Sequence, residues 1–411
     1  MQDRELYAQI LGLQRPWHVI NVALDVESET VEVTAEHRGE VCCPRCGKPC
    51  AGYDTRRRRW RHLDTCQFRT VLIADVPRVR CEEHGVVQME VPWSEAGSRF
   101  TALFERVVID WLKEASVAAV SRRMQLSWDQ VDGIMERAVR RGLARRDELR
   151  PCRIGIDETA YQKRHEYVTV VTDLDESRVL DVADGRKSEC LDRFFTELGQ
   201  ERCAAIEVVA VDMWPAYLRA IERHLPSASV AFDKFHVAKY LGEAVDTVRK
   251  QEHRELRRVG DESLARTKYL WLQNPSNMTD DRWSRLEALR ATTLRTARAW
   301  AIKEHAMQLW DYTRPSWARR AWQRWLGWAS RSRLKPMVDV ARMVRRHLDG
   351  IVNAVVLRAT NALSESMNAK IQRVKARACG YRNRERFRNA ILFHLGGLDL
   401  HPRPGSAHTK S

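Results

Sequence analysis

The chain has 411 residues, of which 44% are hydrophobic and 30% charged, a balance typical of a globular protein and not of a disordered one. A length in this range predicts about two to four domains. The formal net charge of +15 indicates a polyanionic partner, with nucleic acid as the first candidate and a generally basic surface as the alternative.

The N-terminal segment carries an acidic residue early and has no long apolar run, which argues against a signal peptide. No stretch reaches the roughly 18 apolar residues that a membrane helix needs, so no membrane partner is expected. We therefore expect the ten cysteines to lie in a reducing cytosol, where clustered cysteines indicate a metal site more often than disulfides.

Residues 1–98 are predicted to form a zinc-binding β module. Alternating runs at 31–41 and 68–81 predict strands. Cys43 and Cys46 are separated by two residues, and Cys81 and His84 repeat this spacing, which suits one structural zinc ion with four protein ligands. Other ligand registers stay open, and they would use Cys42, Cys50, Cys66 or His62.

A run of basic residues lies between the two halves of the predicted zinc site. Guanidinium groups suit phosphate oxygens, and an aromatic ring could stack or wedge at DNA, so the run is a candidate DNA contact. A solvated basic hairpin is the alternative. The candidate residues are Arg56, Arg57, Arg58, Arg59, Trp60 and Arg61.

Residues 99–150 are predicted to form a helix-turn-helix domain. The pattern favours a helix at 115–124 and a second at 127–140, with Ser127 as a plausible N-cap. In such domains the second helix enters the major groove, which makes Ser127, Gln130 and Arg137 candidate DNA contacts. An ordinary helical hairpin is the alternative.

Residues 151–236 predict a mixed α/β sheet. Three strands at 153–162, 166–174 and 177–185 are followed by a helix at 187–199, a strand at 206–214, a helix at 215–225 and a strand at 227–235. Asp157 lies within the first strand, and Asp212 ends the strand that follows the first helix. A carboxylate within a strand is costly to bury unless a metal or another partner compensates it, so the two aspartates are candidate ligands of a hard cation.

Residues 237–350 predict an all-helical insertion rich in Trp and Arg, in which most Trp side chains are expected to form the core. Arg320 and Arg324 are candidate contacts to the DNA backbone. Residues 351–400 predict two more helices. The first contains Glu365, a third candidate acid, followed by Arg373, Lys375 and Arg377 as further phosphate contacts. The tail at 401–411 is expected to be disordered.

The order of these motifs resembles that of the DDE transposases of bacterial insertion sequences, specifically the ISL-three-like group. It consists of a zinc knuckle, a helix-turn-helix, IGIDE, VAVDMW, DKFHV, a long helical insert and NALSESMNAKIQ. The resemblance implies an RNase H-like catalytic domain with Asp157, Asp212 and Glu365 as the catalytic acids. It also implies an auxiliary role for Asp233 and His236.

The predicted function is therefore DNA transposition, with cleavage and strand transfer at insertion-sequence ends. The expected cofactors are two Mg²⁺ or Mn²⁺ ions held by the three acids, and one structural Zn²⁺. The expected partners are double-stranded transposon ends and target DNA, bound by a homodimer or larger assembly in the bacterial cytoplasm at the nucleoid. The alternatives are a non-enzymatic zinc-dependent DNA-binding regulator and a structure-specific nuclease of the same fold.

Overall fold

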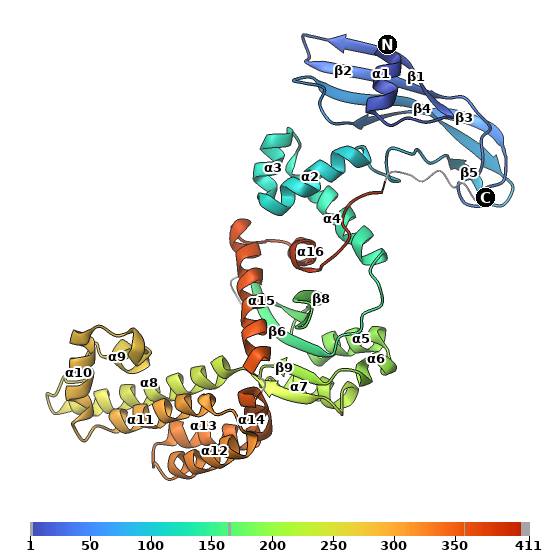
Figure 1. The fold of residues 1–411 in the computed structure, drawn as a ribbon. Helices are drawn as coiled ribbons and strands as arrows, with labels where there is room; N and C mark the ends of the chain where they lie inside the picture. The colour runs from blue at the N-terminus through green and yellow to red at the C-terminus, as the bar shows by residue number, and fades with distance from the viewer. Residues whose placement is uncertain (1–2, 163–165, 357, 404–411) are drawn as a thin grey trace. The chain divides into compact units, whose positions relative to one another are not determined.

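The computed structural model describes residues 3–162, 166–356 and 358–403, and its chain divides into two compact units (Figure 1). Unit 1 consists of the described parts of Met1–Arg146 and Leu398–Ser411, and unit 2 consists of those of Asp147–Gly397. In the described part of the chain, no helix is long and apolar enough to cross a membrane.

A five-stranded sheet forms the N-terminal part of unit 1, with the order β1-β2-β4-β3 and β5 paired to β4. It follows a short helix, α1 (Asp3–Ile10), and the strands are β1 (Trp17–Asp25), β2 (Thr30–His37), β3 (Ala51–Arg61), β4 (Arg69–Cys81) and β5 (Gly85–Gln88). The predicted strands at 31–41 and 68–81 are confirmed as β2 and β4. Their alternating apolar residues, among them Val33, Leu72 and Val76, are fully buried on one face of the sheet.

Three helices complete unit 1: α2 (Ala102–Glu114), α3 (Val117–Met124) and α4 (Trp128–Ala144). Thr101, Ser116 and Ser127 cap their N-termini, because each side chain accepts a hydrogen bond from a free amide of the first turn. The two predicted helices are confirmed as α3 and α4, and α4 extends beyond its predicted end at 140.

The last described residues pack against α2 and α4 within unit 1. Arg141 donates to the carbonyl of Leu400, and Arg145 donates to the carbonyl of His401 at 2.7 Å. His401 Nε2 lies 2.8 Å from Asp110 Oδ1. The prediction of a disordered tail at 401–411 is therefore wrong for residues 401–403, and residues 404–411 lie outside the described residues.

A mixed five-stranded sheet organises unit 2, with the order β10-β9-β6-β7-β8. The strands are β6 (Arg153–Gln162), β7 (Glu166–Asp173), β8 (Arg178–Asp184), β9 (Val208–Val211) and β10 (Ser229–Phe232). The helices between them are α5 (Ser188–Leu198), α6 (Gln200–Ala204) and α7 (Pro215–His224). β7 runs antiparallel to both β6 and β8, whereas β9 is parallel to β6 and to β10. This arrangement confirms the predicted mixed sheet.

Helices fill the chain between β10 and the last two helices of the unit. They are α8 (Lys234–Arg258), α9 (Lys268–Leu272), η1 (Pro275–Asn277), α10 (Asp280–Arg290), α11 (Arg295–Gln308), η2 (Leu309–Asp311), α12 (Pro315–Ser330), α13 (Lys335–Arg346) and α14 (Leu348–Val356). Trp271, Trp322 and Trp325 are fully buried among them, as expected of core tryptophans. The predicted domain boundaries after 236 and 350 fall inside α8 and α14.

Three contacts attach this helical region and the final helices to the sheet. α14 packs on β10 so closely that a Cβ added at Gly350 would come within 2.4 Å of the Phe232 ring. α15 (Arg358–Arg377) runs alongside β6, and α16 (Arg384–Leu395) packs on β8 (Figure 1). The acidic residues of the sheet therefore lie next to helices that are distant in the sequence.

Candidate active site and metal centres

Asp157 lies in β6, and Asp212 directly follows the neighbouring strand β9. β6 and β9 pair in parallel with Ile156 opposite Val211, and each aspartate is the next residue of its chain. A small pocket at this edge of the sheet is lined by Ile156, Asp157, Ala210, Val211, Asp212, Asp233 and His236. The predicted acidic pair and the two predicted auxiliary residues are thus brought together in one place.

Burial makes the charged form of both aspartates costly. It raises the pKa of Asp157 to about 6, although hydrogen bonds from the Glu158 amide and the Asn368 side chain act in the opposite direction. Burial also raises the pKa of Asp212, whereas nearby His236 lowers it. Two half-buried carboxylates with raised pKa values form an oxygen-rich site that a divalent cation would stabilise in the charged form.

Asp233 and His236 sit at the start of α8. Asp233 is the N-cap, and its Oδ1 accepts a hydrogen bond from the Phe235 amide at 2.8 Å. His236 follows in the first turn, and its Nε2 lies 3.6 Å from Asp212 Oδ2. Because the cap fixes where the helix begins, it also fixes where His236 meets the acidic pair.

Three side chains of α15 attach it to β6. Asn368 donates to Asp157 Oδ2, Gln372 Nε2 donates to Thr159 Oγ1 at 2.9 Å, and Lys375 donates to the carbonyl of Ala160. The expectation that Lys375 contacts phosphate is corrected here, because its ammonium binds the sheet. Asn368 had no predicted role, although its position one helical turn after Glu365 could have indicated one. Glu365 lies in α15, and its side chain lies outside the described residues.

A second cluster lies in unit 1, where ligand atoms of Cys43, Cys46, Cys81 and His84 are all within 4.8 Å of one another. The Cys46 and Cys81 sulfurs are 3.7 Å apart, the spacing expected of two ligands about 2.3 Å from one tetrahedral metal ion. The hydrogen bond with His84 lowers the pKa of Cys81 to about 6, which favours the thiolate that binds metal.

Of the alternative ligands, Cys66 and His62 have other environments, whereas Cys50 packs against Cys43 and Cys81 but is not one of the four residues whose ligand atoms lie within 4.8 Å of one another. Cys50 donates to the carbonyl of Lys48 at 3.3 Å, and Cys66 is exposed. His62 is buried and bonded to Thr101 Oγ1 at 2.9 Å. These positions support the register that was favoured by the CxxC and CxxH spacing.

Most of unit 2 matches a known protein family. Residues 154–391, more than half of the chain, match the model of an ISL3 transposase domain that carries the DDE designation. The chain belongs to the ISL3 family of transposases. Residues 89–139 match the helix-turn-helix domain of this family, and residues 39–84 match the zinc finger of the IS204, IS1001, IS1096 and IS1165 transposases.

Two relatives that are transposases of insertion sequences align with most of the chain. The transposase of insertion sequence IS1001 from Bordetella parapertussis is 31% identical over 352 residues, which span 84% of this chain and 87% of the relative. The transposase of IS1557 from Mycobacterium tuberculosis is 31% identical over an alignment that spans 97% of this chain and 96% of the relative. The chain is therefore a DNA transposase, an enzyme that cleaves and transfers DNA, with a DNA-binding helix-turn-helix domain.

In this ISL3 transposase the predicted basic run forms the end of β3. Arg56 and Arg57 are exposed and Arg58 is half-buried, but Arg59 pairs with Glu32. Trp60 is 4% exposed and packs edge-on against Trp93, so the prediction that its ring contacts DNA is wrong. Arg61 pairs with Asp64 and lies over the Phe104 ring, 5.3 Å from its centroid, which makes it a structural residue.

The candidate contacts of the helix-turn-helix also divide into two groups. Ser127 and Gln130 are exposed but form a reciprocal capping box at the start of α4. Arg137 lies 2.9 Å from Glu105, a carboxylate that is only 1% exposed, so its prediction as a DNA contact is corrected to a structural role. The predicted contacts Arg320, Arg324, Arg373 and Arg377 are exposed on α12 and α15.

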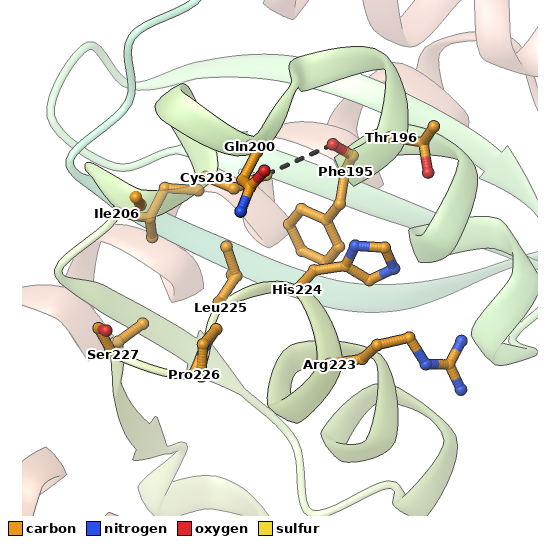
Figure 2. A pocket seen from close by; sticks show the side chains of 12 residues that line it. Phe195, Thr196, Gln200, Cys203, Ile206, Arg223, His224, Leu225, Pro226 and Ser227 are labelled. Carbon is orange, nitrogen blue, oxygen red and sulfur yellow. Dashed lines mark hydrogen bonds between the residues drawn. The ribbon is translucent and has the colours of Figure 1, made fainter.

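A larger cavity of this transposase, of about 460 Å³, lies between α5, α6 and the end of α7 (Figure 2). The Phe195 and His224 rings line it, and the buried Cys203 thiol donates to the carbonyl of Phe195 at 3.4 Å. It shares no lining residue with the acidic pocket, so the two are separate features of unit 2.

Proposed function

We propose that this transposase cuts and joins DNA at the acidic pocket of unit 2, with two divalent cations held by Asp157, Asp212 and Glu365. The observation that carries the proposal is the side-by-side placement of Asp157 and Asp212 at the edge of a mixed sheet in an ISL3-family chain. Unit 2 would then be an RNase H-like domain, and the helices from α8 to α14 its insertion.

The third acid is supported by its position in α15. Position 365 is three residues before Asn368 and seven before Gln372, so the helical period puts all three positions on one side of the helix. Asn368 and Gln372 both contact β6, with Asn368 bonded to Asp157 itself. This geometry favours Glu365 as the acid that completes the set.

Mg²⁺ or Mn²⁺ fits the residues of the pocket, because they offer carboxylate oxygens. A bound cation would also offset the cost of burying these carboxylates in their charged form. When bound, two such ions stabilise the attacking and leaving oxygens of a phosphoryl transfer. The three acids would hold the cations, and His236 and Asn368 would orient Asp212 and Asp157.

The proposed chemistry has two transfers and needs no covalent protein intermediate. In the first, a water oxygen attacks the scissile phosphorus and the bond to the 3′ oxygen breaks. In the second, the freed 3′ hydroxyl attacks a target phosphorus and displaces the target's own 3′ oxygen.

Unit 1 and the basic residues outside the pocket would recognise and bind the DNA. A single zinc ion on Cys43, Cys46, Cys81 and His84 would hold the loops of unit 1, and α4 would read the terminal repeats with Ser127 and Gln130 near the groove. Arg56, Arg57, Arg320, Arg324, Arg373 and Arg377 would contact phosphates. Because two ends must be joined, we propose a homodimer or larger assembly on DNA, at the nucleoid of a bacterial cytoplasm.

Incubation with labelled element ends and Mg²⁺ tests the proposal, with wild-type protein compared to Asp157→Asn. We expect metal-dependent cutting and joining by the wild type only. Equal cleavage by both proteins would refute the role of Asp157. Cutting without joining would favour the structure-specific nuclease, and binding without cutting would favour the regulator.

A further inference from the structure

Arg186 is held between two aromatic rings, one of which belongs to Trp214, two residues after Asp212. Its guanidinium carbon lies 4.6 Å from the centroid of Trp214 and 4.9 Å from that of Tyr167. The side chain is 40% exposed. Stacking against two rings restricts where this cation can go while one part of it stays open to solvent.

The backbone at this position is fixed as well. Gly185 has a φ of +79°, a left-handed conformation that turns the chain from β8 toward α5. Its amide donates to the Tyr167 carbonyl at 2.9 Å, and its carbonyl accepts from Thr169 Oγ1 at 2.7 Å. The Arg186 carbonyl accepts from Trp214 Nε1 at 3.0 Å. The guanidinium is therefore positioned before any ligand arrives, which lowers the entropy cost of binding.

The residues around Arg186 connect it to both catalytic strands. Glu158, its ion-pair partner, directly follows Asp157, and Trp214 is two residues beyond Asp212. Because neighbouring side chains of a strand point to opposite faces, Glu158 and Asp157 lie on opposite sides of β6. Arg186 therefore lies on the side of β6 that carries Glu158 and outside the acidic pocket, and it is linked to the acidic pair through Glu158 and Trp214.

The guanidinium retains donors that a ligand could use. Among the residues that the structure describes, its one ionic contact is to Glu158 Oε2 at 3.6 Å, which is longer than a hydrogen bond. By contrast, Arg153 on the same sheet donates directly to Asp175 at 2.6 Å. An arginine that only neutralised local acids would pair as Arg153 does, so the stacked geometry indicates another partner for the five N–H groups.

We propose that Arg186 is a positioning residue that binds one phosphate of the DNA strand adjacent to the scissile phosphate. The inference rests on the proposed function of the acidic pocket. A planar fork of N–H donors matches phosphate oxygens, and a contact next to the reacting group would hold the strand in line for the transfer.

The test compares wild-type protein with Arg186→Gln and Arg186→Lys, and with Arg290→Gln as the matched control. Arg290 is also stacked on two rings, at 4.5 Å from Trp300 and 5.7 Å from Trp283, but it lies in the helical region. End binding is measured against salt in an Asp157→Asn background, where no cleavage interferes. Cleavage is measured on ends that carry one neutral methylphosphonate at successive positions flanking the cut.

We expect Arg186→Gln to weaken end binding about 10- to 100-fold and to reduce the salt slope by about one, as the loss of one charged phosphate contact requires. At one position, the neutral methylphosphonate should slow cleavage by the wild type and by Arg290→Gln by a similar factor. The same substitution should leave cleavage by Arg186→Gln unchanged. The melting temperature should change little in both variants. An unchanged slope, or the same methylphosphonate profile for Arg186→Gln and the wild type, would overturn the proposal.

If Arg186→Gln does not fold, the Arg186→Lys variant tests the proposed role of Arg186. Lysine keeps the charge but cannot stack and present a planar fork, so cleavage should fall about tenfold while binding keeps its salt slope. Wild-type cleavage by Arg186→Lys would then refute the role. Equal cutting by the wild type and Asp157→Asn would instead refute the proposed function, while the salt slope would still test Arg186.

Discussion

The cysteine cluster of unit 1 and the acidic pocket of unit 2 are both suited to metal ions, but they differ in ligands and in completeness. The cluster offers three sulfurs and one nitrogen, all within 4.8 Å, which fill a tetrahedral coordination shell. The pocket offers the carboxylate oxygens of Asp157, Asp212 and Asp233, and none of its lining residues supplies a sulfur ligand. A closed shell favours a structural ion, whereas an open shell is required where the metal must meet the reacting phosphate.

Removal of the metal from unit 1 should have the largest effect on stability. Structural zinc contributes on the order of 10 kcal/mol in zinc-finger peptides, and the loops around Cys43 and Cys81 have little other core. Cys43→Ser should lose the bound zinc, as measured by metal analysis, and hydrogen exchange should increase in unit 1 only. Cys66→Ser, an exposed thiol outside the cluster, should retain one zinc. Zinc retained by Cys43→Ser would refute this ligand set.

Removal of a ligand from unit 2 should affect chemistry and leave folding intact. Asp157→Asn should slow cleavage about 10⁴-fold, equivalent to roughly 5 to 6 kcal/mol, because the charge that holds the cation is lost. DNA binding should be unchanged. Asp184→Asn is the matched control, since Asp184 ends β8 of the same sheet and pairs with Arg384. A loss of end binding in Asp157→Asn would contradict the expectation that this residue affects the chemistry alone.

The buried carboxylate of unit 1 tests whether an acid can be purely structural in this protein. Glu105 pairs with Arg137 and Arg141 and accepts from Ser98 Oγ at 2.8 Å. Glu105→Gln should destabilise unit 1 by about 3 to 5 kcal/mol, because it leaves buried arginine charge unpaired. Chemical denaturation measures the change. Wild-type stability in this variant would show that the network contributes little to the fold.

In metal-free protein, lowering the pH should change the stability of the two units in opposite directions. Burial lowers the pKa of His62 to about 4, so its contribution is present above the unfolded pKa near 6.5 and is lost as pH falls toward 4. The pKa of Asp157 is raised, so its contribution is present below its unfolded value and is lost as pH rises through about 6.

Each group should change the free energy of unfolding by about 3 kcal/mol across its full window. The measurement is the pH slope of unfolding for His62→Gln and Asp157→Asn against the wild type. Lowering the pH from 6.5 to 4.5 should destabilise the wild type relative to His62→Gln, and should stabilise it relative to Asp157→Asn. If His62→Gln and Asp157→Asn had the same pH slope of unfolding as the wild type, the burial of these two groups would be contradicted.

The two sites also differ in how far the sequence could predict them. The CxxC and CxxH spacing predicted the four clustered ligands directly, because short local spacing determines the knuckle. The apolar residues around Asp157 and before Asp212 predicted that one acid lies within a strand of the mixed sheet and that the other ends a strand of it. The contact of Asn368 with Asp157 depends on how α15 packs on β6, which the local sequence does not encode.

The basic residues were harder to predict, since composition does not reveal which cations have protein partners. Arg137 and Lys375 resembled surface charges but bind Glu105 and the Ala160 carbonyl. Trp60 resembled an exposed aromatic within an arginine run, yet the alternation of β3 turns it into the core. Arg186 could not be recognised as a candidate phosphate-binding residue from the sequence, because its ring partners come from β7 and from the loop after Asp212.

The return of Leu398–Arg403 to unit 1 bears on the order of events during protein synthesis. Arg141 is buried, and one of its hydrogen bonds goes to the carbonyl of Leu400, which is translated 259 residues later. Hence α2, α3 and α4 emerge from the ribosome long before their last partner exists. The DNA-binding unit reaches its final hydrogen bonding only after the whole catalytic unit has been translated, which couples the completion of one to the synthesis of the other.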